Sequence, residues 1–186
     1  RSQTVTGVQT CALPIYHPDV RIKTALDPEL FNIVGSRLHI RKSLMNLVIN
    51  AAEALEKQGK IVISTSNCYL DKPLAGYSDV QMGEYALLSV TDNGPGITTE
   101  EIGRIFEPFY TRKVMGRSGT GLGLTVVWNT LQDHDGYIDV ESTLDVGSVF
   151  RLYFPATRET PCREDKPLPI EAYMGRGEHI LVVDDI

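Results

Sequence analysis

Apolar residues in the first part of the chain follow two different periods. Every second residue from Val20 to Leu26 is apolar or β-branched, which predicts a half-buried strand over this range. Ser36 can cap a helix that follows, and Gly59 can end it. Within that stretch apolar residues recur at steps of three and four, the spacing of one helix face. This face comprises Ile40, Leu44, Leu47, Val48, Ala51 and Leu55.

The middle of the chain predicts two more strands and a short helix. Strands are expected over 60–66 and 85–91, separated by a polar loop from 68 to 83 that contains glycine and proline. Thr98 and Glu101 have the spacing of a capping box, so a short helix is expected to begin there and to end near residue 106.

The pattern closes with a second long helix and a hairpin. The helix is expected over about 121–134, where an Asp-Gly pair stops it. Strands over 137–143 and 148–154, joined by a four-residue turn, predict a hairpin that Pro155 terminates. Strands and helices thus alternate along one compact core.

The ends of the chain differ from this core. Residues 5–15 match the translation of a common sequencing-adaptor oligonucleotide, so 1–16 are interpreted as an artefactual leader, with a genuine linker as the alternative. The core domain is placed at 17–156. Residues 157–177 are charged and proline-rich, as a linker is. Residues 178–186 contain an apolar run that ends in two aspartates, which resembles the first strand of a truncated receiver domain of a response regulator.

Composition narrows the class of protein. The 186 residues are 42% hydrophobic, enough to bury the core of one domain. Lys and Arg number 18 against 24 for Asp and Glu, a net charge of -6 that offers no basic surface for nucleic acid. No apolar run approaches the roughly 18 residues that span a bilayer. The cysteines, Cys11, Cys68 and Cys162, are too far apart to suggest a metal site or a disulfide framework. A cytoplasmic domain is expected, although its parent could be anchored to a membrane by segments upstream.

Polar residues on the first long helix form a stripe beside its apolar face. Asn46, Asn50, Glu53 and Lys57 are spaced by four, three and four residues. A solvated helix flank is the ordinary explanation of such a stripe. Asparagine is a mediocre helix former, however, which favours a functional role. The stripe alone leaves both interpretations open.

Two glycine-bearing segments follow in order. Asp92 directly follows a predicted strand, and Gly94 and Gly96 would let the backbone approach a flat ligand, although an ordinary turn has the same composition. An aspartate there can accept a hydrogen bond from an exocyclic amine of adenine. Further on, glycines from Gly119 lead into a helix, where free N–H groups favour phosphate, but the spacing is neither that of a P-loop nor that of a dinucleotide fingerprint. The order of the stripe and the two segments is the stronger evidence.

In register, these residues resemble the sensor histidine kinases, specifically their catalytic ATP-binding domain, over roughly 20–155. Residues 46–51 resemble the N box of that family, 92–96 the first glycine box, 106–109 the F box and 119–124 the second glycine box. The resemblance implies an α/β sandwich, the Bergerat ATP-binding fold, in which helices cover one face of a mixed sheet.

The resemblance also implies the site. Asn50 would ligate Mg²⁺, Asp92 would bind the adenine amine, and residues 109–118 would form a mobile lid with Lys113 as a phosphate partner. Asn46, Asn50 and Lys113 are the expected catalytic residues. The ATP-binding set is expected to be Asn50, Asp92, Gly94, Gly96, Ile97, Phe106, Phe109, Thr111, Lys113, Gly119, Thr120, Gly121, Leu122 and Gly123.

The reaction that the resemblance implies needs a partner. The γ-phosphoryl group of ATP would move to a histidine on a dimerisation hairpin, which this chain lacks, and then to a receiver domain or response regulator. The four histidines of the chain, His17, His39, His134 and His179, are expected to be structural or solvent-facing. Trp128 and Phe150 are expected in the core. The fragment is expected to be a monomer that cannot phosphorylate itself, from a parent that is a homodimer.

Two alternatives remain open. A degenerate domain could hold nucleotide and change partners without transferring phosphate. An ATP-hydrolysing machine of the same fold is disfavoured, because its relatives carry a water-activating glutamate where this chain has Asn46 and an amide cannot take a proton from water.

Overall fold

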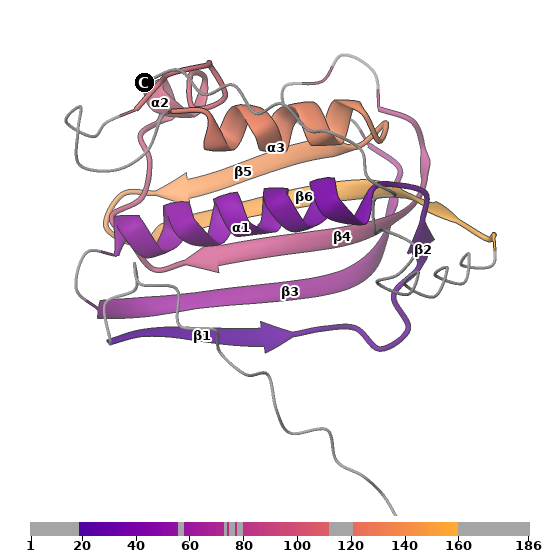
Figure 1. Cartoon of the computed structure of the whole chain (residues 1–186), viewed down its shortest axis with the longest axis horizontal. Helices are drawn as coiled ribbons and strands as arrows, with labels where there is room; N and C mark the ends of the chain where they lie inside the picture. Colours follow the sequence, from indigo (N-terminus) through magenta and orange to yellow (C-terminus); the bar gives the residue numbers. More distant parts are fainter. Residues whose placement is uncertain are drawn as a thin grey trace, which may run out of the picture.

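The computed structural model describes residues 19–55, 58–72, 74, 77, 80–111 and 121–159. Figure 1 shows one sheet whose strands run side by side, with the two long helices lying across one face of it. The elements in chain order are β1 (Asp19–Ala25), β2 (Asn32–Ile33), α1 (Arg37–Ala54), β3 (Gln58–Leu70), β4 (Gly83–Asp92), α2 (Thr99–Ile102), α3 (Gly123–Gln132), β5 (Tyr137–Thr143) and β6 (Gly147–Thr157). The predicted two-layer α/β sandwich is confirmed.

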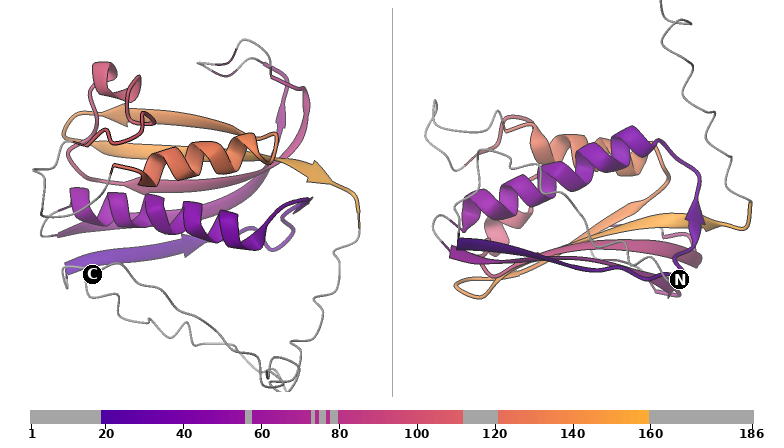
Figure 2. Two further views of the ribbon diagram at one scale, coloured as in Figure 1. Left: turned by 45° about the horizontal axis from the view of Figure 1, so that its top comes forward. Right: turned by 60° about the horizontal axis from the view of Figure 1, so that its bottom comes forward.

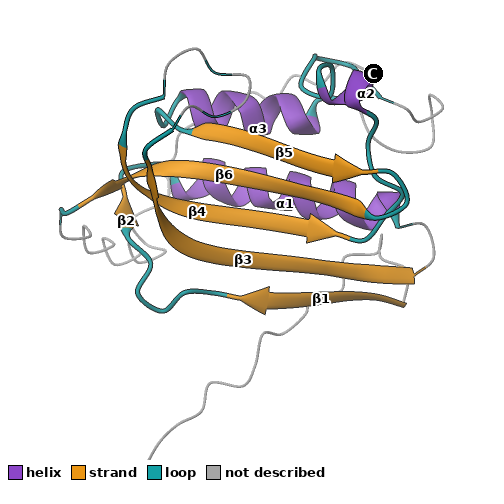
Figure 3. Cartoon of the chain, turned by 180° about the vertical axis from the view of Figure 1, so that it is seen from behind, coloured by secondary structure: helices purple, strands orange, loops and turns teal. Residues whose placement is uncertain are grey.

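The sheet is mixed. Its strands follow the order β1-β3-β4-β6-β2, and β5 pairs with β6. β1 is parallel to β3, whereas all the other pairs are antiparallel. Figure 3 views the sheet from behind, where no described helix covers it. Every described helix therefore packs on the same face of the sheet.

The core lies between the helices and this covered face. Alternate residues of β6, from Phe150 through Leu152 to Phe154, are buried against the helices. Leu47 of α1 and Leu131 of α3, each exposed to 1% or less, pack against these strand residues from the helix layer. Figure 2 shows this two-layer packing edge-on. The predicted apolar face of α1 is confirmed, because its members are buried or packed against the core.

The first strand is not half-buried as predicted. β1 forms the edge of the sheet beyond β3, and Ile22 is 45% and Leu26 61% exposed. Only Val20 packs against the core. Alternation predicts which face a residue shares, but the position of the strand in the sheet decides whether a helix covers that face.

Several element ends also differ from prediction. Gly59 does not end α1, which stops at Ala54, and instead lies inside β3. The capping box of Thr98 and Glu101 is present, yet α2 ends at Ile102. Helix ends depend on backbone partners that a sequence pattern does not specify.

Pro155 does not terminate the last strand. The ladder between β4 and β6 ends at Pro155, as expected for a residue without an N–H group. The strand nevertheless continues, because Ala156 and Thr157 pair with Ile33 and Asn32 of β2. The predicted leader and the receiver strand lie outside the described residues, as does the linker beyond residue 159. No helix among the described residues is long and apolar enough to cross a membrane.

Candidate functional site

A cavity of about 470 Å³ opens between α1, the loop after β4, α2 and the start of α3. Its wall combines polar residues of α1 with the buried end of β4 and an apolar floor. The residues that line it are Asn46, Ile49, Asn50, Ala51, Glu53, Ala54, Asp92, Pro95, Gly96, Ile97, Glu101, Ile105, Tyr110, Thr111, Gly121, Gly123, Leu124, Ser148 and Phe150.

The polar stripe of α1 faces this cavity. Asn46, Asn50 and Glu53 all line it, so the stripe is not simply a solvated flank. The amide nitrogen of Asn46 donates a 3.1 Å hydrogen bond to the carbonyl oxygen of Gly123, which ties α1 to the first turn of α3. Lys57, the last residue of the predicted stripe, lies outside the described residues.

Asp92 supplies a carboxylate at the inner end of the cavity. Its position at the end of β4 leaves it only 7% exposed. Burial raises the pKa of Asp92 above its usual value, and the backbone N–H groups of Gly94 and Ser148 act in the opposite direction. Oδ1 accepts the Gly94 N–H at 2.8 Å, which leaves acceptor capacity on the carboxylate for a donor in the cavity.

The loop after Asp92 is held against the turn between β5 and β6. The Asp145 N–H donates to the Pro95 carbonyl oxygen at 2.9 Å. Gly96 has a φ of +76°, and a Cβ there would collide with the Thr143 carbonyl oxygen. The glycine therefore permits a close approach of two protein segments, in addition to the approach to a ligand that the sequence suggested. Gly96 and Ile97 line the cavity, whereas Gly94 contacts Asp92 behind it.

The first residue of the predicted lid, Phe109, contacts the cavity residue Gly121, whereas the lid beyond Thr111 lies outside the described residues. The Phe109 N–H donates to the Gly121 carbonyl oxygen at 3.0 Å. Gly121 has a φ of +69°, and a Cβ there would lie 2.6 to 2.8 Å from backbone atoms of Phe109. Thr111 and Tyr110 line the cavity on one side of this contact and Gly123 on the other. Lys113, Gly119 and Thr120 lie outside the described residues.

Besides Gly94, three more of the expected ATP-binding residues that the structure describes do not line the cavity. The Phe106 ring packs against Trp128 instead, with ring centroids 5.4 Å apart. Phe109 is 72% exposed and Leu122 36% exposed. Leu122 is the N-cap of α3, and its side chain makes no capping hydrogen bond. The first residue of this ten-residue helix, Gly123, lines the cavity, so the N-terminus of α3 faces the cavity. Such a terminus favours an anion.

The cavity also contains residues that the sequence analysis did not assign to it. Glu101 was predicted only as a capping residue, and its carboxylate does accept from the Thr98 N–H and hydroxyl. Ser148 was predicted only as a strand residue, yet it is 5% exposed and adjoins Asp92 in the sheet. Phe150, predicted in the core, is buried and also forms part of the wall. These residues reach the site through strand pairing and loop packing, which the linear pattern does not display.

His134 is structural, as predicted. Its Nε2 accepts the Ser36 N–H at 2.9 Å, and Nδ1 lies 2.6 Å from the Thr130 carbonyl oxygen. The imidazole thereby joins the end of α3 to the start of α1. The described residues contain no group of three His, Cys, Asp or Glu side chains placed to hold a metal ion.

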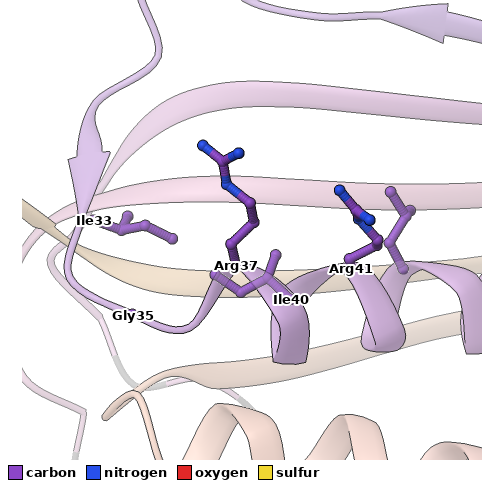
Figure 4. Close-up of a pocket in the computed structure, with 6 residues that line it drawn as sticks. Ile33, Gly35, Arg37, Ile40 and Arg41 are labelled. Atoms are coloured by element: carbon purple, nitrogen blue, oxygen red, sulfur yellow. The ribbon is translucent and has the colours of Figure 1, made fainter. Parts of the chain in front are cut away.

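A second, more open groove of about 400 Å³ lies near the start of α1. Figure 4 shows Arg37 and Arg41 extending from the helix beside Ile33 and Ile40. Among the described residues that line this groove, none has a carboxylate or an amide side chain. The cavity at Asp92 is therefore the stronger candidate for a polar ligand.

The sequence and the fold are similar to those of known proteins. Residues 35–158 match the family model described as histidine kinase-, DNA gyrase B-, and HSP90-like ATPase. The sensor kinase CckA of Brucella abortus (strain 2308) is 30% identical over 151 residues, which are 81% of this chain and 16% of the relative. The signal transduction histidine-protein kinase AtoS of Escherichia coli (strain K12) is 35% identical over 153 residues, 82% of this chain and 22% of the relative. The chain thus spans less than a quarter of the length of either kinase.

A solved structure supports the same assignment. The catalytic domain of histidine kinase ThkA, in a nucleotide-free form, superposes with a TM-score of 0.58 at 31% sequence identity. The superposition covers 74% of this chain and 80% of that domain. Full-length ShkA in complex with AMPPNP superposes with a TM-score of 0.58 at 28% identity, covering 77% of this chain and 27% of that protein.

Proposed function

The chain belongs to the family of histidine kinase-, DNA gyrase B- and HSP90-like ATPases and is the ATP-binding catalytic domain of the sensor histidine kinase type; from this premise we propose that the cavity at Asp92 binds Mg-ATP and presents its γ-phosphoryl group to a histidine of another domain. The observation that carries the proposal is the buried, cavity-lining carboxylate of Asp92 together with the amides of Asn46 and Asn50.

Asp92 would hold the adenine end of the nucleotide. Its carboxylate is buried, and the backbone N–H groups of Gly94 and Ser148 still leave acceptor sites on it for the exocyclic amine. The neighbouring wall offers Ile97, Ile105 and Phe150, apolar side chains that suit the faces of an aromatic ring. A flat, amine-bearing base therefore fits this end of the cavity.

Asn50 and the start of α3 would hold the phosphate end. The amide oxygen of Asn50 is a ligand that suits Mg²⁺, and this ion would neutralise phosphate charge when bound. The N–H groups at the start of α3 favour the negatively charged phosphates as well. Lys113 with the glycines of the second box, of which Gly121 and Gly123 line the cavity, would complete the phosphate contacts.

Transfer to histidine is favoured over hydrolysis. A water-activating base would stand at the position of Asn46, whose amide cannot accept a proton and instead donates to the Gly123 carbonyl oxygen. In the transfer, a histidine nitrogen forms a bond to the γ-phosphorus while the bond to the β–γ bridging oxygen breaks, and ADP leaves with that electron pair. The chain contributes positioning and charge neutralisation.

The remaining components would come from the parent protein. We propose that it is a homodimeric sensor kinase in which a helical hairpin carries the phosphoacceptor histidine. Residues 17–156 would form its catalytic domain, followed by a linker and a receiver domain. Alone, the domain would be a monomer that binds nucleotide without phosphorylating itself.

Titration calorimetry with ATP tests the proposal on the full chain, with and without Mg²⁺. Asp92→Ala should abolish binding, and Asn50→Ala should bind ATP without the Mg²⁺ dependence of the wild type. Glu100→Ala, an exposed change on α2 that does not line the cavity, is the control and should bind normally. A folded wild-type chain that binds no nucleotide would contradict the proposal and favour a degenerate partner-binding domain. If the wild type binds, adding a histidine-bearing hairpin in trans should produce phosphohistidine.

A further inference from the structure

Two serines lie in adjacent strands behind the adenine end of the proposed site. Ser142 of β5 and Ser148 of β6 are direct partners in the antiparallel ladder. On its other side Ser148 is the partner of Asp92 in β4. Ser148 lines the cavity, whereas Ser142 does not. Ser142 is therefore one strand further from the ligand than the residue it touches.

The hydrogen bonds of Ser142 fix the direction of every proton in this pair. Its hydroxyl oxygen accepts the Ile97 N–H at 2.8 Å and lies 3.0 Å from the Gly147 carbonyl oxygen. A carbonyl only accepts, so the single hydroxyl proton of Ser142 goes to Gly147. The Ser148 hydroxyl, also 3.0 Å away, must then donate its own proton to Ser142. Only this arrangement makes all three contacts hydrogen bonds.

This arrangement determines what Ser148 can offer to a ligand. With its proton committed to Ser142, the Ser148 hydroxyl presents only lone pairs toward the cavity. The ionised carboxylate of Asp92, its neighbour in the sheet, also only accepts. This end of the cavity therefore favours a ligand edge that donates, directly or through a water molecule, and disfavours an edge that accepts.

We infer that Ser142 is a positioning residue that makes the site select 6-aminopurine over 6-oxopurine nucleotides. It acts by orienting the hydroxyl of Ser148 and by holding the loop at Ile97, without touching the base. The inference rests on the proposed function, because it assumes that the purine binds at Asp92. Removal of the Ser142 hydroxyl frees the Ser148 proton to turn toward the cavity, where it can donate to a 6-oxo group.

The test compares ATP with inosine triphosphate, which has an oxo group in place of the 6-amino group. Affinities are measured by calorimetry on the full chain and on its Ser142→Ala and Ser142→Cys variants. The thiol is close in size to the hydroxyl but a weak hydrogen-bonding group, so this variant tests the same loss with less change in packing. We expect the preference for ATP over inosine triphosphate to fall about 3- to 10-fold in both variants, the range of one neutral hydrogen bond.

Two controls make the result specific. Ser142→Thr keeps a hydroxyl and should retain the wild-type preference, and Thr143→Ala, at the exposed neighbouring position of the same strand, should do so too. Equal losses of affinity for both nucleotides in the Ser142 variants would show a merely structural role and overturn the inference. An unchanged preference in these variants would overturn it as well, while leaving ATP binding intact. A wild type that binds neither nucleotide would instead overturn the proposed function, and the inference with it.

Discussion

Replacing the Asp92 carboxylate by an amide should separate ligand binding from stability. In the Asp92→Asn variant the amide oxygen can still accept the Gly94 N–H, which is 2.8 Å from Oδ1 in the wild type, so this contact with the loop is retained. The amide NH₂ group then points where the second carboxylate oxygen was. It would face the adenine amine, donor against donor.

The expected loss of affinity follows from the kind of hydrogen bond removed. A hydrogen bond to a charged group contributes about 1.5 to 3 kcal/mol, and its loss should raise the dissociation constant for ATP roughly 10- to 150-fold. The side chain is buried, so bulk solvent does not replace the lost partner.

The amide is expected to weaken ATP binding but not to lower the stability of the fold. Burial raises the pKa of Asp92 in the folded chain. Where a folded pKa lies above the unfolded one, the unfolded state loses its proton first, so stability falls as the pH rises from the unfolded pKa through the folded one. At neutral pH the ionised carboxylate is therefore destabilising, and the amide should raise the melting temperature of the nucleotide-free chain or leave it unchanged.

Two assays on the same samples decide the matter. Calorimetry gives the ATP affinity, and thermal unfolding from pH 3 to 8 gives the stability. The variant should lack the decline in stability that the wild type shows as Asp92 ionises. Unchanged ATP affinity in a folded variant would refute the assignment of Asp92, and a clearly lower melting temperature at neutral pH would refute the argument about its burial.

Two further predictions concern the stability of the fold, and each compares two variants. Ser43→Ala should raise the free energy of unfolding by about 1 kcal/mol, because the Ser43 hydroxyl is fully buried without a hydrogen-bond partner. Ser36→Ala, at the N-cap of the same helix, should instead lower it by about 1 kcal/mol. Urea unfolding measures both changes, and a lower free energy of unfolding in Ser43→Ala would contradict the reasoning. Gly96→Ala should lower the free energy of unfolding by about 2 kcal/mol or more, because φ at this residue is +76° and the added methyl group would collide with the Thr143 carbonyl oxygen. Gly103→Ala is the control and should leave the stability unchanged, because the nearest atom to its added Cβ is 3.8 Å away. Equal urea midpoints for the two variants would disprove the strain at Gly96.

The elements that the sequence predicts well are those with local signals. Ser36 and Thr98 cap helices through contacts three residues away, and a period of two or of three to four residues reports which side chains share a face. The exposure of Ile22 could not be predicted in this way, because it depends on β1 lying at the edge of the sheet. The extension of β6 past Pro155 likewise depends on β2, which is more than 120 residues away in the sequence.

The candidate site shows the same division. Asn50 and Asp92 stand in motifs that resemble a family, so both could be placed in one cavity from the sequence. Ser148 could not, because its role arises from pairing with Asp92 across two strands. Phe106 belongs to a motif but packs on Trp128, which shows that a motif residue can support a site without lining it.

The contact between Phe109 and Gly121 has a consequence for which residues these two positions can carry. A hydrogen bond and close backbone packing join them within the fold. The Phe109 side chain is 72% exposed, whereas a Cβ at position 121 would lie 2.6 to 2.8 Å from backbone atoms of Phe109. Over evolution the side chain at position 109 can therefore change without disturbing the contact, whereas position 121 is restricted to glycine.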